Sequence, residues 1–62
     1  MKVRVIRLPL PPPDPSDGIE VGRVFNVISV YGSGMQFPGY WVFGDSGRAV
    51  MLYPLDVEIT DE

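Results

Sequence analysis

Four side chains of this 62-residue chain are candidates for catalysis: Asp45, Ser46, Asp56 and Glu58. A serine nucleophile needs a base beside it, and the chain contains no histidine, which is the usual base at neutral pH. Arg48 or a carboxylate is a poor substitute. Glycosidase chemistry needs two carboxylates that flank a cleft, which a chain this small rarely forms. The sequence therefore predicts a protein without catalytic residues.

Metal and cofactor binding are not predicted either. The chain has no cysteine and no histidine, so thiolate and imidazole ligands are both missing. Asp14 and Asp17 could offer oxygen ligands to Ca²⁺ or Mg²⁺, but two acids beside prolines fall well short of a coordination loop. We expect no metal site and no cofactor.

The aromatic side chains are the strongest candidates for binding. They could stack the bases of a single-stranded nucleic acid, with Arg23 and Arg48 flanking them at the starts of two strands. However, affinity for nucleic acid depends largely on basic residues that neutralise phosphates, and the formal net charge is −3. Nucleic-acid binding is therefore an alternative prediction. Many of these rings are also needed to fill a core. The stacking candidates are Tyr31, Phe37, Tyr40 and Trp41.

A central hairpin organises the predicted fold. Residues 40–43 and 49–53 are mostly aromatic, β-branched or apolar, as in strands. Between them, the sequence Gly44-Asp45-Ser46-Gly47 is typical of a tight turn. Alternation places Tyr40 and Val42 on one face of the first strand and Trp41 and Phe43 on the other. Since neither strand has a purely polar face, we expect further strands to cover the hairpin.

The two ends of the chain carry opposite charge. Basic residues begin it at Lys2, Arg4 and Arg7, whereas acidic residues crowd its end. We interpret this as a first strand lying beside a last strand, residues 57–60, with their charges paired. The alternative is a basic strip that meets an acidic partner or RNA.

Three segments separate these elements. Residues 9–18 form a proline-rich loop that is either a ligand for an aromatic groove on another protein or a stiff connector. Residues 23–31 form a long strand with a kink or an edge at Asn26, whose amide would need partners if buried. The glycine-bounded loop after Tyr31 carries Met35 and Phe37, which are either a plug under the fold or an exposed contact.

This order of elements resembles the small SH3-like barrels. The local matches are Gly39-Tyr40-Trp41-Val42, the turn Asp45-Ser46-Gly47, and Tyr53-Pro54-Leu55-Asp56-Val57 at a predicted helical turn. The resemblance implies an all-β, five-stranded barrel over residues 1–62, with a long first loop and one short helical turn before the last strand. It also implies a peptide groove with Tyr53 and Pro54, and less clearly Trp41, at its floor. The acidic aromatic motif of that family's first loop is absent. The resemblance further implies a small barrel of the sort that phages and mobile elements encode as regulators of host proteins.

We therefore expect a non-catalytic protein-binding module or a small regulator of a partner protein. A homodimer through the same surface is a further alternative, because a small monomer gains stability by covering an edge. No signal peptide or membrane-spanning apolar run is visible, so we expect a soluble cytoplasmic protein. The predicted contact residues are Tyr31, Met35, Phe37, Tyr40, Trp41, Tyr53 and Pro54.

Overall fold

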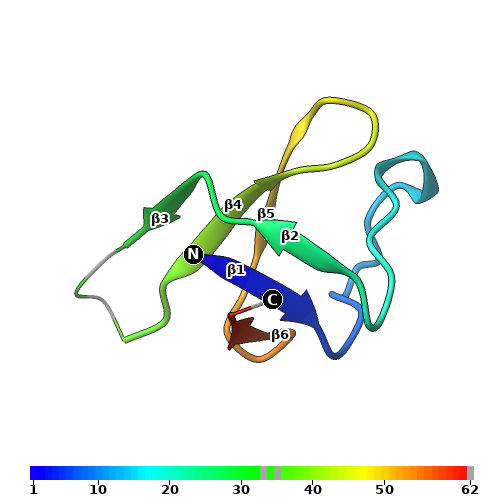
Figure 1. Ribbon diagram of the computed structural model, residues 1–62. Helices are drawn as coiled ribbons and strands as arrows, with labels where there is room; N and C mark the ends of the chain where they lie inside the picture. The colour runs from blue at the N-terminus through cyan, green and yellow to red at the C-terminus, as the bar shows by residue number, and fades with distance from the viewer. Residues whose placement is uncertain (33, 35, 62) are drawn as a thin grey trace.

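The structure is a computed structural model that describes residues 1–32, 34 and 36–61. Among these residues the chain forms six strands and one short 3₁₀ helix (Figure 1). The predicted all-β class is therefore confirmed. In order, the elements are β1 (Lys2–Val5), the 3₁₀ helix η1 (Pro15–Asp17), β2 (Val24–Asn26), β3 (Ser29–Tyr31), β4 (Gly39–Phe43), β5 (Ala49–Leu52) and β6 (Val57–Thr60).

The first sheet has the strand order β2-β1-β6, and both strand pairs are antiparallel. Arg4 lies opposite Glu58 in the β1–β6 ladder, and Arg4 Nη1 is 2.9 Å from Glu58 Oε1. Just beyond β1, Arg7 Nε is 3.0 Å from Asp56 Oδ1. The prediction that the first and last strands pair their opposite charges is therefore confirmed.

The second sheet has the order β3-β4-β5 and contains the predicted central hairpin. The ladder runs from Tyr40 opposite Leu52 to Phe43 opposite Ala49. In the turn, the Gly44 amide donates to the Arg48 carbonyl at 2.9 Å, and Gly47 has φ = 87°, a conformation that glycine adopts without strain. The hairpin has the strands and the turn that the sequence predicted.

The predicted long strand 23–31 is broken after Asn26 and serves both sheets. The Val27 amide still donates to the carbonyl of Met1, the residue just before β1, at 2.9 Å. The next amide, that of Ile28, donates to the Trp41 carbonyl of β4 at 2.8 Å. The chain thus crosses from one sheet to the other between two consecutive residues. This is the bend that the polar Asn26 indicated.

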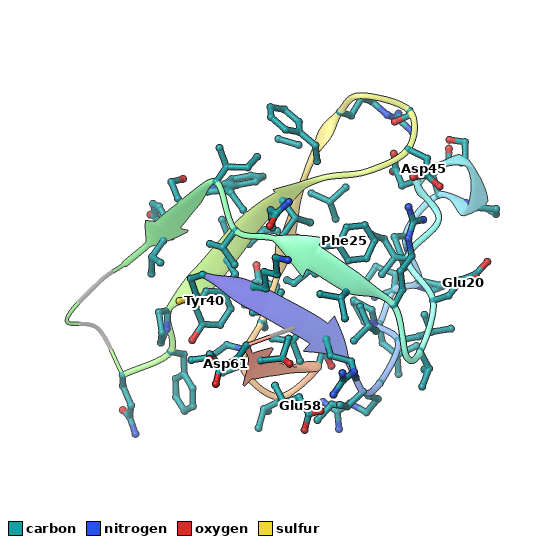
Figure 2. The ribbon with its side chains drawn as sticks, viewed as in Figure 1. Glu20, Phe25, Tyr40, Asp45, Glu58 and Asp61 are labelled. Atoms are coloured by element: carbon teal, nitrogen blue, oxygen red, sulfur yellow. The ribbon has the colours of Figure 1, made fainter. Side chains whose placement is uncertain are left out.

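The core lies between the two sheets. Val3 and Val5 of β1 are fully buried, as are Val42 of β4 and Leu52 of β5. Phe25 of β2 points between the sheets in Figure 2 and is 7% exposed. Val57 of β6 and Ile19, which follows η1, complete the buried cluster. Because Ile19 belongs to the segment after the proline-rich run, the core also anchors that end of the loop.

The expected five-stranded SH3-like barrel is wrong. Within the described residues the structure has two open three-stranded sheets, and apart from the crossing at Val27–Ile28 no strand ladder joins them. Closing a barrel requires an edge strand of one sheet to pair with an edge strand of the other. Here the chain leaves β5 through a turn and adds β6 to β1 instead. The peptide groove and the phage regulator that this resemblance implied lose their basis with it.

A turn does lie where a short helical turn was predicted before the last strand, but it is not a helix. Residues 54–56 form a turn in which the Asp56 amide donates to the Tyr53 carbonyl at 2.9 Å. The Asp56 carbonyl accepts the amides of both Ile6 and Arg7, so the segment that follows β1 holds this residue in place just before β6. The 3₁₀ helix lies at Pro15–Asp17 instead, and the Asp14 carboxylate caps it by accepting the Ser16 amide.

Candidate functional site

The outward-facing side of the second sheet is an exposed apolar surface. Side chains alternate along a strand, so β4 turns Tyr40 and Val42 toward the core and Trp41 and Phe43 away from it. The ladders place residues of β3 and β5 on the same side as Trp41. We call this surface the outer face, and it consists of Ser29, Tyr31, Gly39, Trp41, Phe43, Ala49 and Met51.

Large apolar side chains dominate the outer face. Tyr31 is 61% exposed and Phe43 is 58% exposed, while Trp41 and Met51 are half-buried. Gly39 leaves room for Met51, because a Cβ atom at this position would overlap the Met51 thioether. The Met51 side chain therefore lies over the glycine backbone and beside Trp41, its partner in the ladder. An indole ring next to an adaptable thioether offers a contact surface that can adjust its shape.

The outer face carries no charge, and the same is true of a long stretch of sequence around it. All five basic and all eight acidic residues of the chain lie outside residues 24–44. This stretch includes β2, β3 and β4 completely. The centre of a protein interface is depleted in charged residues, and aromatic residues and methionine are enriched there. The composition of the outer face is that of an interface centre.

The predicted contact residues do not all lie on one surface of the molecule. Tyr31 and Trp41 belong to the outer face. Tyr53 comes directly after β5, two residues beyond Met51, and is 50% exposed. Tyr40 lies on the opposite side of the sheet, packed against the core. Phe37 is 66% exposed in the loop before β4, Pro54 is half-buried in the turn before β6, and Met35 lies outside the described residues.

Arg23 and Arg48, the predicted flanks of a nucleic-acid platform, lie in a polar network with Asp45 and Asp17. Figure 2 shows Asp45 at the end of the molecule opposite β3. The Asp45 carboxylate accepts two hydrogen bonds from Arg23, at 2.5 and 2.7 Å. Arg48 Nη2 is 3.4 Å from Asp14 and 3.5 Å from the buried carboxylate of Asp17. Both guanidinium groups thus face carboxylates, and neither belongs to the outer face.

This network joins η1 to the turn of the hairpin. The buried Asp17 carboxylate accepts a hydrogen bond from the Ser46 hydroxyl, and the Asp17 carbonyl accepts the Asp45 amide at 3.0 Å. The hydrogen bond from Arg23 holds the pKa of Asp45 below its usual value, and the Ser16 amide does the same for the pKa of Asp14. Ser46 and Asp45, which were considered for catalysis, therefore act here as structural groups that tie the loop to the turn.

Two further observations concern metals and membranes. Among residues 1–32, 34 and 36–61, no three carboxylates gather as ligands of a metal ion would. In the same ranges, no helix has both the length and the apolar character that spanning a membrane requires.

No protein family, no curated protein and no solved structure shows a significant match to this chain. The side chains of the outer face alone therefore indicate the binding site. Two prominent members of the outer face, Phe43 and Met51, were not among the predicted contact residues. The sequence did contain a signal for Phe43, because it alternates with Trp41. Met51 required the register across the turn, which pairs it with Trp41.

Proposed function

We propose that this chain is a non-catalytic protein-binding module, or a small regulator of a partner protein, that binds its partner through the outer face. One observation carries the proposal: a sheet face without any charge, on which Trp41 lies beside Met51 and Phe43. Aromatic anchors supply most of the binding energy at protein interfaces. The partner that fits this face is a protein surface with an apolar, uncharged centre.

The geometry of the rim supports the same partner class. Asp45 and Arg48 are the charged residues nearest in sequence to the outer face. Both lie between β4 and β5, beyond the Phe43–Ala49 end of that face. An uncharged centre with charged groups at its border is the usual anatomy of a protein interface. A single-stranded nucleic acid would instead require cations beside the aromatic rings. The two nearby arginines contact Asp14, Asp17 and Asp45.

The proposal can be tested with a pair of matched variants. Phe43→Ser removes an exposed ring from the outer face, and Ile59→Ser removes a comparably exposed apolar side chain (63%) from β6 in the other sheet. Wild type and both variants are used as baits in a lysate of the source cells, and retained proteins are quantified. We expect a protein that is retained by wild type and Ile59→Ser but lost with Phe43→Ser. Identical retention by all three baits would overturn the proposal.

A direct titration then measures the contact. The retained protein is purified and added to each variant while the emission of Trp41, the single tryptophan, is recorded. Loss of an aromatic anchor costs more than about 1.4 kcal/mol, so we expect at least roughly tenfold weaker binding for Phe43→Ser and little change for Ile59→Ser. A single-stranded oligonucleotide serves as a second probe. Binding of the oligonucleotide that weakens steeply with salt would favour the nucleic-acid alternative over this proposal.

A further inference from the structure

β3 is a sheet edge that lacks two common protections against pairing with another chain, charged side chains and proline. Edge strands are commonly protected by charged side chains, proline or bulges. The four strands at the edges of the two sheets are β2, β3, β5 and β6. β6 carries Glu58, β5 lies between Arg48 and Pro54, and β2 follows Arg23, whose guanidinium covers the Phe25 ring at 4.7 Å. Around β3, residues 27–32 contain neither a charged residue nor a proline.

The side chains of β3 are also available. All three residues of the strand are exposed, including Val30 at 41% and Tyr31 at 61%. Ile28, just before the strand, is 48% exposed. These are β-branched and aromatic residues, which favour strand pairing. Because backbone groups alternate in direction along a strand, half of the N–H and C=O groups of β3 point away from β4 toward the open edge.

We propose that two copies of this chain pair through β3, antiparallel to each other, about a twofold axis at Val30. In this register Val30 faces Val30 of the second copy, and Ser29 faces Tyr31. A strand that pairs with its own copy places identical segments together, so the absence of charge means that no like charges meet. The joined sheet contains the three strands of each copy and places the two outer faces side by side.

A second copy suits this edge because β3 and the residues on both sides of it carry no charge that a copy would repel. Each copy carries a net charge of −3, which opposes self-association unless the charged regions stay apart. Asp45 and Glu20 lie at the end of the molecule away from β3 (Figure 2), so pairing at β3 keeps these carboxylates of the two copies distant. A chain of 62 residues buries only about 60% of the surface of its unfolded form, and covering an edge adds to its stability.

Sedimentation from micromolar to millimolar concentration tests the dimer. A pairing confined to one edge strand covers less than the roughly 800 Å² per partner of a standard interface, so we expect dissociation on the order of micromolar or weaker. Val30→Lys and Val30→Glu each place two like charges on the twofold axis, and each should be monomeric. A mixture of the two variants should dimerise again, because the facing charges are then opposite. Val30→Thr, which keeps a β-branched side chain, is the control.

Three results would overturn the proposal. The first is a wild type that stays monomeric at millimolar concentration, and the second is a Val30→Lys variant that dimerises as wild type does. The third is a mixture of the two charged variants that remains monomeric although circular dichroism shows both to be folded. The dimer does not depend on the proposed function. Phe43→Ser should therefore dimerise normally, and loss of the dimer in that variant would place the contact on the outer face instead.

A disulfide test gives the register directly. The chain has no cysteine, so Val30→Cys introduces a single thiol. Residues directly opposite in an antiparallel pair have Cβ atoms about 4.5–5.5 Å apart, near the distance that a disulfide requires. We expect Val30→Cys to form a disulfide-linked dimer under mild oxidation much faster than Ser16→Cys, a control thiol on exposed η1. Equal rates would contradict the twofold axis at Val30.

Discussion

Asp17 joins η1 to the turn of the central hairpin, and removal of its carboxylate should destabilise the fold. The residue is 4% exposed. Its carboxylate accepts the Ser46 hydroxyl and lies 3.5 Å from Arg48 Nη2. In Asp17→Ala, the hydroxyl and the guanidinium that lose their partner are near the surface and can bind water. In Ser46→Ala, by contrast, the carboxylate remains buried and loses its closest donor.

The expected cost follows from these contacts. A hydrogen bond to a charged group contributes about 1.5–3 kcal/mol, and an ion pair as exposed as that of Arg48 adds at most about 1 kcal/mol. We expect Asp17→Ala to lose about 2 kcal/mol of unfolding free energy, and Ser46→Ala at least as much, because it takes the hydroxyl donor away from Oδ1 of a buried carboxylate. At roughly 0.05–0.15 kcal/mol per residue, the total stability of this chain is about 3–9 kcal/mol. Each variant should therefore melt roughly 8–16 °C below wild type.

Thermal and urea unfolding, followed by far-UV circular dichroism, measure these differences. The set contains wild type, both single variants, the double variant and Asp61→Ala as a control at the exposed end of the chain. Both substitutions remove the same contact, so the double variant should cost about as much as one single variant. Strict additivity, or a Ser46→Ala variant with the melting temperature of wild type, would refute the role given to this contact.

Three other predictions concern the core, the turn and pH. Leu52→Ala empties a fully buried position and should cost about 2–5 kcal/mol, so we expect a urea midpoint well below that of wild type, and an unchanged midpoint would contradict the core assignment. Gly44→Ala would place a Cβ atom 2.6 Å from Asp17 Oδ1, so its melting temperature should fall, and an unchanged value would mean that the turn is looser than described. A carboxyl whose pKa is lowered in the folded state stabilises the fold above its unfolded pKa, and this contribution is lost as the pH falls through the lowered value. The pKa of Asp45 is lowered from 3.8 by its hydrogen bond to Arg23. The urea midpoint of wild type should therefore decrease when the pH is lowered below about 4, and the midpoint of Asp45→Asn should decrease less steeply over the same pH range.

The sequence predicted the parts of the fold that depend on neighbouring residues or on a simple pairing of charge. The alternation on either side of Gly44-Asp45-Ser46-Gly47 was sufficient for β4 and β5. The alternation of residues 57–60 gave β6, and the opposite charges of the two chain ends placed it beside β1. The polar Asn26 marked the break in the long strand. Each of these signals lies within a few residues or concerns one pair of strands.

The closure of the sheets depends on longer-range choices that the pattern does not contain. The same alternation suits a strand in a closed barrel and a strand in an open sheet. Asp56 shows one such long-range contact, because its carbonyl binds two amides beyond β1 and its carboxylate binds Arg7, far away in the sequence. The 3₁₀ helix, in contrast, did have a local signature: an Asp cap, a proline at the first position and Gly18 in the left-handed conformation. Its place inside a proline-rich run concealed it.

The charges divide the molecule into two parts that should respond independently to substitution. The network of Asp17, Asp45 and Arg48 fixes the loop and the turn at one end, while the uncharged stretch 24–44 supplies β3 and most of the outer face. Exposed side chains of that stretch contribute little to the core, so Phe43→Ser and Val30→Lys should change association without much change in melting temperature. Asp17→Ala should do the opposite. If the association variants melted as low as Asp17→Ala, the outer face and β3 would be parts of the folding core rather than binding surfaces.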